Sequence, residues 1–509
     1  MNESPVKWTA SIEPASLAPE GEAFQGYSFG PDSAGSDDSK SDSAKKLTEQ
    51  STTLDAQGLK TVEANLANID YKGSANLIFE GTIRSAGRQE LAGRAVVPLH
   101  RGDFQIGLRG ASAVGKAGEK FKIEGLAVSP EGKLVAGQKI KLELVRREWK
   151  SVRKAGVDGR YQWVSEVKDE SVSTQEFTSG QEAVVQEVTP PKAGYYVVHA
   201  TAEDGKKNPI VTDASFYVSG TDYVGWERKE GDEIKLVTDK KGYKPGDTAK
   251  ILVQNPYEGK TQALVTLERE HILEQYVQEV EGSTPTIDVP LTSKHLPNVY
   301  VSVVLIKGRL ADKGFGPDGD DLGKPSFRIG YANLPVETAE KKLTVTVKTD
   351  KESYQPGEEV TVNTDVKDSK GQGVSAEFSL AAADVGVLNL IHFQTPNYFD
   401  TFYGIRSLVV ATTETRLDVI GQRVYGTKGA NPGGGGSDES SVRQDFKYTA
   451  YWDPSVRTDG QGHATLKFKL PDNLTTFRLM AVAQTQGSDF GSGEAKFSVK
   501  KNLMLQPTV

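Results

Sequence analysis

Two copies of one short pattern organise this chain. Residues 238–247 read TDKKGYKPGD, and residues 349–358, 111 positions later, read TDKESYQPGE. In each copy the Pro-Gly pair marks a turn, and an alternating run follows it, TAKILVQN in one and EVTVNTDV in the other. A weaker copy, VGKAGEKFKIEGLAV, begins at Val114 and again places Gly and an acidic residue before an alternating run. The pattern therefore predicts a repeated unit built of strands.

The ends of the expected units also resemble one another. FQIGLRG closes the first near residue 110, FYVSG the second near 220, FRIGY the third near 331 and FSVKK the last near 501. Strands of this length, in units of about 110 residues, are typical of β-sandwiches. The sequence therefore predicts an all-β chain of tandem antiparallel β-sandwich domains, fibronectin III-like or Ig-like. The expected domains are residues 1–111, 112–220, 221–338 and 339–509.

Two segments interrupt these units with residues that cannot build a core. Residues 28–48 include GPDSAGSDDSKSDSAKK, which predicts a disordered insertion in the first domain. The last unit is longer than one repeat, and its extra residues include four consecutive glycines, Gly433 to Gly436, beside Ser, Asp and Glu. Strands are expected on both sides of this stretch. It is therefore interpreted as an exposed insertion within one domain, open to proteolysis, rather than a linker between domains.

Composition excludes several classes of function. The net charge of −8 and the isoelectric point near 5.6 argue against a nucleic-acid partner, which requires a basic face. No apolar run approaches the length of a membrane span. The chain has no cysteine, so it cannot form a disulfide, a thiol nucleophile, a cysteine metal site or its own thioester. No cofactor or metal motif is evident, and no secretion signal is visible at the start.

Several long stretches, in order, resemble the alpha-2-macroglobulin family, especially its bacterial branch. The resemblance covers most of 225–509 and is weaker over 60–220. The stretches that carry it are YKPGDTAKILVQNPYEGKTQALVTLEREHIL (243–273), LPNVYVSVVLIKG (296–308), FRIGYANLPVE (327–337), SYQPGEEVTVNTDVKDSKGQGVSAEFSLAAADVGVLNL (353–390), FYGIRSLVVATTETR (402–416) and FKYTAYWDPSVRTDGQGHATLKFKLPDNLTTFRLMAVAQT (446–485).

This resemblance implies macroglobulin-like domains in a broad-spectrum protease inhibitor that is not itself an enzyme. In the family, a target endopeptidase cleaves an exposed bait region, the scaffold changes conformation and the protease is trapped. A later domain of the parent chain often carries a thioester, which this chain cannot form for itself. The implied partners are endopeptidases and the remaining domains of the parent chain. The implied location is extracytoplasmic, in a bacterial periplasm, with a membrane-anchored lipoprotein as an alternative for the full-length protein.

The resemblance places the bait region at about 413–445. A protease needs several residues in extended form with free backbone groups, and glycines lower the cost of that conformation. The basic side chains suit trypsin-like pockets, and the apolar and aromatic ones suit elastase-like or chymotrypsin-like pockets. The cleavage candidates are Arg416, Arg423, Tyr425, Lys428 and Arg443, with Gly433, Gly434, Gly435 and Gly436 supplying flexibility.

Two alternatives remain open. The chain could be a structural or adhesive array of Ig-like domains that binds surface ligands, with the glycine-rich stretch a passive loop. It could instead be a hydrolase, although no nucleophile–base pair is readable from the sequence. The near-match GASAVGKA at 110–117 ends in alanine where a phosphate loop needs Ser or Thr. PDGDDLG at 317–323 lacks the distal acid of a calcium loop, and the six histidines show no metal-binding spacing.

Overall fold

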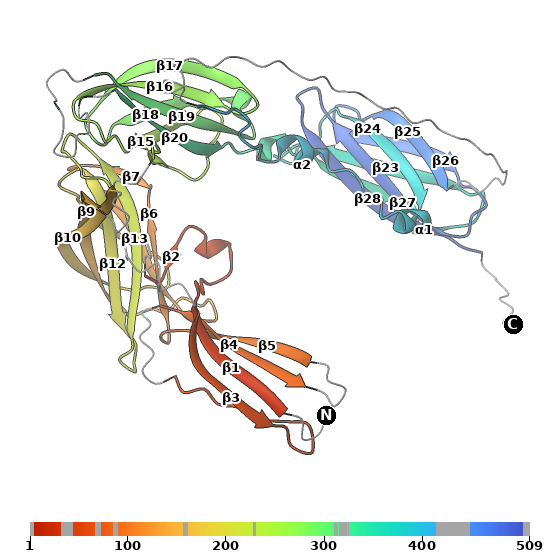
Figure 1. Ribbon diagram of the computed structural model, residues 1–509. Coiled ribbons are helices and arrows are strands. Elements are labelled where there is room, and N and C mark those ends of the chain that lie inside the picture. Colours follow the sequence, from red (N-terminus) through yellow and green to blue (C-terminus); the bar gives the residue numbers. More distant parts are fainter. Residues whose placement is uncertain are drawn as a thin grey trace, which may run out of the picture.

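The computed structural model describes most of the chain and shows β-sheets throughout (Figure 1). The described residues are 5–31, 44–66, 73–84, 90–155, 161–227, 231–309, 314, 323, 325–413 and 448–501. Within them, four β-rich units follow one another along a bent row, from the red N-terminal unit to the blue C-terminal one. The prediction of an all-β chain with antiparallel sheets is confirmed.

The first unit is one sheet in the order β3-β1-β4-β5, as far as its described residues show. Its strands are β1 (Pro5–Pro14), β3 (Lys45–Thr53), β4 (Ala75–Arg84) and β5 (Glu90–Leu99). Trp8, Ala10 and Ile12 alternate along β1 and are buried, as expected for a strand with one face toward a core. Residues 28–31 and 44–48 of the expected disordered insertion belong to ordered structure, and 32–43 lie outside the described residues.

The second unit is a sandwich of two sheets in its described part, ordered β11-β8-β6-β2 and β10-β9-β12-β13-β7. Its strands are β2 (Ser28–Phe29), β6 (Gln105–Gly110), β7 (Val114–Lys116), β8 (Phe121–Val128), β9 (Lys139–Ala155), β10 (Tyr161–Thr178), β11 (Val184–Val188), β12 (Gly194–Glu203) and β13 (Pro209–Ser219), and η1 (Glu22–Phe24) precedes β2. The boundary expected at 111 cuts this unit, because β6 pairs with β8. FQIGLRG therefore belongs to the second unit and does not close the first.

The third unit again packs two sheets, ordered β14-β15-β18 and β17-β16-β19-β20 in the described residues. The elements are β14 (Leu236–Thr238), β15 (Thr248–Val253), β16 (Lys260–Glu268), β17 (Ile272–Glu281), β18 (Thr286–Pro290), η2 (Ser293–His295), β19 (Asn298–Lys307) and β20 (Ser326–Pro335). Val299, Val301, Val303 and Leu305 of β19 are fully buried. The run VYVSVVLI thus forms a central strand of this unit with one face fully buried.

The fourth unit has sheets ordered β21-β23-β26 and β22-β28-β27-β24-β25 over its described residues. The elements are η3 (Ala339–Lys341), β21 (Thr344–Thr349), β22 (Ser353–Tyr354), β23 (Glu359–Lys367), β24 (Glu377–Asp384), α1 (Val385–Leu390), α2 (Tyr398–Tyr403), β25 (Thr449–Arg457), β26 (His463–Lys469), β27 (Thr476–Gln484) and β28 (Phe490–Val499). Phe378, Leu380 and Phe477 lie in the core between its sheets.

The repeated pattern has a physical reason in the third and fourth units. Tyr243 and Tyr354 are buried, and each hydroxyl donates to the aspartate four positions earlier, at 2.8 Å to Asp239 and 2.7 Å to Asp350. Each aspartate also accepts a backbone N–H from the following strand, at 2.9 Å in both units. The Tyr-x-Pro-Gly turn is therefore fastened to the strands on either side of it.

The glycine of that turn is common to all three copies. Gly246 and Gly357 have φ of 99° and 75°, and Gly118 in the weaker copy has φ of 79°. A residue with a side chain rarely adopts this backbone conformation. The weaker copy, which lacks the tyrosine, therefore keeps the turn of the pattern without its side-chain hydrogen bond.

Candidate functional site

The site predicted from the sequence lies almost wholly outside the described residues, which stop at Thr413 and resume at Tyr448. The cleavage candidates Arg416, Arg423, Tyr425, Lys428 and Arg443 all fall in 414–447, as do Gly433, Gly434, Gly435 and Gly436. The residues that hold the two flanks of this interval are described, and they define the site below.

The chain leaves one sheet well before this interval and re-enters the same sheet after it. β24 and β25 pair as antiparallel neighbours, with Ala383 opposite Thr449. The backbone N–H of Asp384 donates to the carbonyl of Tyr448 at 2.9 Å. Residues 385–447 therefore connect two neighbouring strands of one sheet, where a short hairpin turn would be enough to join them. They form an insertion in the fourth unit.

The insertion begins with α1, which Asp384 starts. The Asp384 carboxylate accepts the backbone N–H of Gly386 at 2.7 Å and of Val387 at 3.4 Å, which satisfies two donors that a helix start leaves open. The chain then runs along the fourth unit, where the Arg478 guanidinium donates to the carbonyl of Phe393 at 2.8 Å. These contacts keep the first part of the insertion on its own domain.

α2 lies where the third and fourth units meet (Figure 1). Phe402 stacks on Phe490, the first residue of β28, with ring centroids 4.8 Å apart. The Tyr403 hydroxyl donates to the carbonyl of Ser488 at 2.7 Å. The ammonium of Lys342, in the segment that joins the two units, lies 5.7 Å from the ring of Phe399. α2 therefore covers the joint between the two units.

Beyond α2 the insertion crosses to the third unit and binds there through Asn298. The Asn298 side chain accepts the backbone N–H of Arg406 at 2.9 Å and donates to the carbonyl of Arg406 at 3.0 Å. Asn298 is fully buried, and its amide also donates to Asn333 at 2.8 Å. The side-chain amide thus bonds the backbone of Arg406 as a neighbouring strand would.

Charged groups surround this contact. The Arg406 guanidinium donates to one oxygen of Glu270 at 2.6 Å, and the Arg269 guanidinium donates to the other at 2.7 Å. Arg269 also donates to the carbonyl of Leu296 at 2.6 Å, and its own carbonyl accepts the N–H of Val409 at 2.9 Å. We call Arg269, Glu270 and Asn298 the clasp.

The clasp carboxylate stays charged over a wide pH range. Its hydrogen bond from Arg406, followed by that from Arg269, lowers the pKa of Glu270 to about 2. Because the Glu270 side chain is 40% exposed, water screens its ion pairs, and their contribution to stability is small. The geometry of the clasp therefore depends chiefly on Asn298, whose side chain is fully buried.

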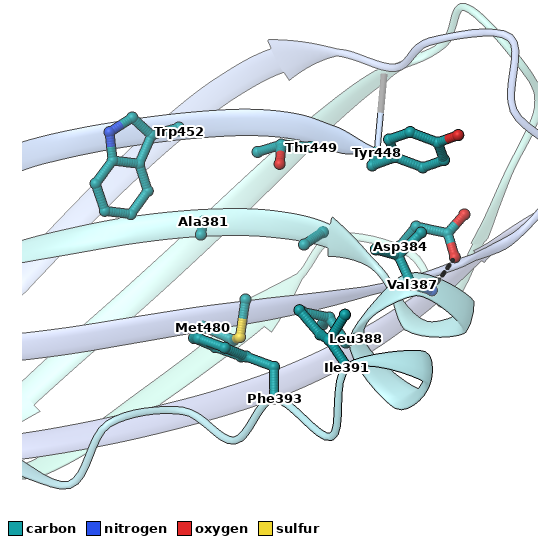
Figure 2. Close-up of a pocket in the computed structure, with 11 residues that line it drawn as sticks. Ala381, Asp384, Val387, Leu388, Ile391, Phe393, Tyr448, Thr449, Trp452 and Met480 are labelled. Carbon is teal, nitrogen blue, oxygen red and sulfur yellow. Dashed lines mark hydrogen bonds between the residues drawn. The ribbon is translucent and has the colours of Figure 1, made fainter. Parts of the chain in front are cut away.

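A groove of about 530 Å³ lies beside both ends of the insertion (Figure 2). Tyr448 and Trp452 of the β25 side face Leu388, Ile391 and Phe393 across it, with Met480 at its floor. Trp452 is 61% exposed and Ile391 is 62% exposed. This part of the fourth unit therefore presents apolar side chains to solvent close to where the insertion leaves and returns.

No local pattern in the sequence indicates the clasp. Asn298 and Arg406 are 108 positions apart, and Glu270 and Arg406 are 136 apart. An asparagine at the start of a strand and an Arg-Glu pair in a turn are ordinary in any β-protein. Within the described ranges, no group of three metal-binding side chains is present. No helix in these ranges has the length and apolar character to cross a membrane.

Three family models match the chain in separate places. "Bacterial macroglobulin domain 6" matches residues 107–220. "Alpha-2-macroglobulin bait region domain" matches 234–390, and "Alpha-2-macroglobulin family" matches 449–509. The first match begins within β6 and covers the second unit from there to its last strand, β13. The interval between the other two matches contains α2, the residues bound by the clasp and the whole of 414–447.

Curated relatives carry the same family name. An alpha-2-macroglobulin homologue of Nostoc sp. is 34% identical over 405 residues, which cover 78% of this chain and 21% of the relative. Alpha-2-macroglobulin of Escherichia coli is 23% identical over 497 residues, covering 90% of this chain and 28% of the relative. The chain therefore spans less than a third of the length of these relatives.

The chain also matches solved structures of native and trypsin-activated alpha-2-macroglobulin of E. coli. Each is 20% identical over 98% of this chain, with TM-scores of 0.36 and 0.33, and the chain covers 31% and 32% of them. Because three of its segments match models of this family, and because it is 34% identical to the Nostoc relative over 78% of its length, the chain belongs to the alpha-2-macroglobulin family.

Proposed function

We propose that this chain contributes the bait-bearing part of a broad-spectrum protease inhibitor. Residues 413–445 are the bait, and cleavage by a target endopeptidase starts the conformational change by which the protease is trapped. The chain acts as substrate and scaffold, and performs no catalysis of its own. Its partners are endopeptidases and the other domains of the parent protein, in an extracytoplasmic compartment such as a bacterial periplasm.

One observation carries this proposal: the two described flanks of 414–447 are fastened to different units. Val409 bonds the third unit through Arg269, and Tyr448 bonds the fourth through Asp384. The third and fourth units are joined first by the chain segment that contains η3 and again by the insertion. A cut between Val409 and Tyr448 would sever the second of these connections. Releasing such a constraint is a known way to switch a protein between two arrangements.

The choice of prey would follow from the side chains in the interval. Arg416, Arg423, Lys428 and Arg443 offer bonds to trypsin-like proteases, and Tyr425 offers one to chymotrypsin-like proteases. Without cysteine, this chain cannot form a thioester of its own, so covalent capture of prey would need a cysteine elsewhere in the parent protein.

The experiment replaces all four basic residues of the interval, Arg416, Arg423, Lys428 and Arg443, by glutamine. Trypsin should then lose its earliest cuts, while chymotrypsin and elastase keep theirs. A matched control replaces four exposed basic residues of strands, Lys168, Lys250, Lys260 and Lys467, and should leave the trypsin pattern unchanged. If trypsin cuts the first variant as early as the wild type, the bait assignment is wrong and the adhesive-array alternative is favoured.

A further inference from the structure

The backbone just after α2 combines exposure with restraint. The Arg406 side chain is 43% exposed, and the Arg406–Ser407 bond has the sequence that trypsin prefers. Ser407 and Val409 are exposed as well. By exposure alone, this bond would be as good a target as any in the interval proposed as bait, and it precedes that interval by only a few residues.

Hydrogen bonding argues against cleavage there. A protease binds its substrate as an extended strand, through backbone N–H and C=O groups on both sides of the bond that it cuts. Both backbone groups of Arg406 are bonded by Asn298, and the N–H of Val409 is bonded by Arg269. A protease can pair with this segment only after the segment leaves the third unit.

The partner of that backbone is rigid. Asn298 is the first residue of β19, which is paired on both sides, by β16 and by β20. Its side chain is fully buried and bonds Asn333 on β20 as well as Arg406. A buried amide that loses one of these partners is left unsatisfied, which is costly. Asn298 therefore favours the bound state of the segment.

Glu270 holds the same segment from the side. It receives one guanidinium from the segment, Arg406, and one from the clasp, Arg269. Charge-assisted hydrogen bonds of this kind are stronger than neutral ones. They also fix the Arg406 side chain on the third unit, away from the position that it would need in a trypsin-like pocket.

We propose that the clasp sets the N-terminal limit of the segment that proteases can cut. Asn298 and Glu270 are positioning residues: they keep residues 406–409 bound to the third unit, so that cleavage is confined to residues after 413. The biological role of this restraint rests on the function proposed above. The restraint itself can be tested without any measurement of protease trapping.

The test is brief digestion of the whole chain with trypsin, with intact masses measured before a second cut occurs. The product 407–509 reports a first cut at Arg406–Ser407. It should be almost absent from the wild type. Asn298→Ala should raise its initial rate by roughly tenfold or more, because cleavage of a restrained segment follows its open population. Glu270→Ala should raise it less, by roughly two- to fivefold, because water screens its ion pairs. Cuts within 413–445 should keep their rates to within about twofold.

Glu279→Ala is the matched control. Glu279 is an exposed carboxylate on β17, paired with Lys260 at 2.6 Å, in the same sheet as the clasp but without a bond to residues 406–409 among those described. It should behave as the wild type. A variant that merely destabilised the third unit would speed cuts at many bonds, whereas loss of the clasp should affect one.

The proposal is overturned if wild-type protein is cut at Arg406–Ser407 as early as within 413–445. It is also overturned if both variants leave that bond as slow as in the wild type. Should Asn298→Ala fail to fold, Glu270→Ala decides alone. If the first wild-type cuts fall outside 413–445 while the variants still release 407–509, the clasp stands and the bait assignment fails.

Discussion

Asn298 and Arg406, 108 positions apart, are joined by two hydrogen bonds from one side-chain amide to one backbone residue. The amide supplies a donor and an acceptor side by side, which is how a peptide group of a neighbouring strand would bind. A single buried side chain thereby ties the insertion of the fourth unit to the third. The joint between these units is crossed by the chain segment at η3 and again by the insertion.

The first prediction concerns the hydroxyl that fastens the repeated turn. Burial, and then the hydrogen bond to Asp350, raises the pKa of Tyr354 to about 12, so the hydroxyl remains a donor at neutral pH. Tyr354→Phe should lower the stability of the fourth unit by about 1–2 kcal/mol. The slowest-exchanging amides of β23 should exchange faster in proportion. Those of β15, in the third unit, should not change, and equal effects in both units would contradict the assignment.

A second prediction tests how α2 is held. A six-residue helix is too short to be stable by itself, so α2 depends on Phe490 and Ser488. Phe490→Ala removes the stacked ring and should speed hydrogen exchange at Tyr403 and Gly404 by about tenfold, a typical effect of losing an aromatic pair and its buried area. Phe79→Ala, which removes a ring stacked on Trp8 in the first unit, is the control and should leave α2 unchanged.

A third prediction is a pH dependence in the second unit. His199 on β12 lies opposite Asp213 on β13, with Nδ1 and the carboxylate oxygen 2.6 Å apart. The hydrogen bond to Asp213 raises the pKa of His199 above its usual 6.5, against the opposing effect of burial. The pair should therefore stabilise the folded state fully below pH 6.5. That stabilisation should be lost as the pH rises through the higher pKa of the folded state.

Thermal unfolding of wild type and His199→Gln, measured side by side from pH 5 to pH 9, checks this dependence. The advantage of the wild type should be largest at the acid end and should decline above about pH 6.5. Asp213→Asn should abolish the decline. An advantage that grew with pH would show that burial, and not the aspartate, determines the titration of His199.

The fourth prediction concerns acid and the clasp. Because the pKa of Glu270 is lowered from 4.5 to about 2, its ion pairs should contribute fully above pH 4.5 and be lost as the pH falls toward 2. Hydrogen exchange at the Val409 amide, compared between wild type and Glu270→Gln at equal pH, measures this contribution. The two proteins should differ at pH 6 and converge near pH 2. A difference that persisted at pH 2 would contradict it.

The fold was largely predictable because its strands carry strong local signals. The Tyr-x-Pro-Gly pattern indicates a turn. Leu343, Val345 and Val347 alternate along the chain, as in a strand with one buried face, and all three are buried. The limit expected at 111 divides the second unit, because strands that end in similar residues do not reveal which strands pair. No local feature of the sequence indicates that β6 pairs with β8, later in the chain, and not with a strand of the first sheet.

The contact between the clasp and residues 406–409 could not be predicted, since it joins two separate domains and is made largely to backbone groups. Asn298, Glu270 and Arg406 are unremarkable in sequence, and their meeting depends on how two folded units are joined. The bait residues present the opposite case. Their glycine content and side-chain chemistry can be read from the sequence, but Arg416 to Arg443 lie outside the described residues, so their role stays a prediction.

The most direct measurement is a time course of limited digestion of the wild-type chain by trypsin, chymotrypsin and elastase, with the earliest cuts mapped by intact mass. If 413–445 is the bait, all three proteases should cut first within it, despite their different side-chain preferences. First cuts scattered among the domain junctions, or in the interval around residues 32–43, would contradict the account.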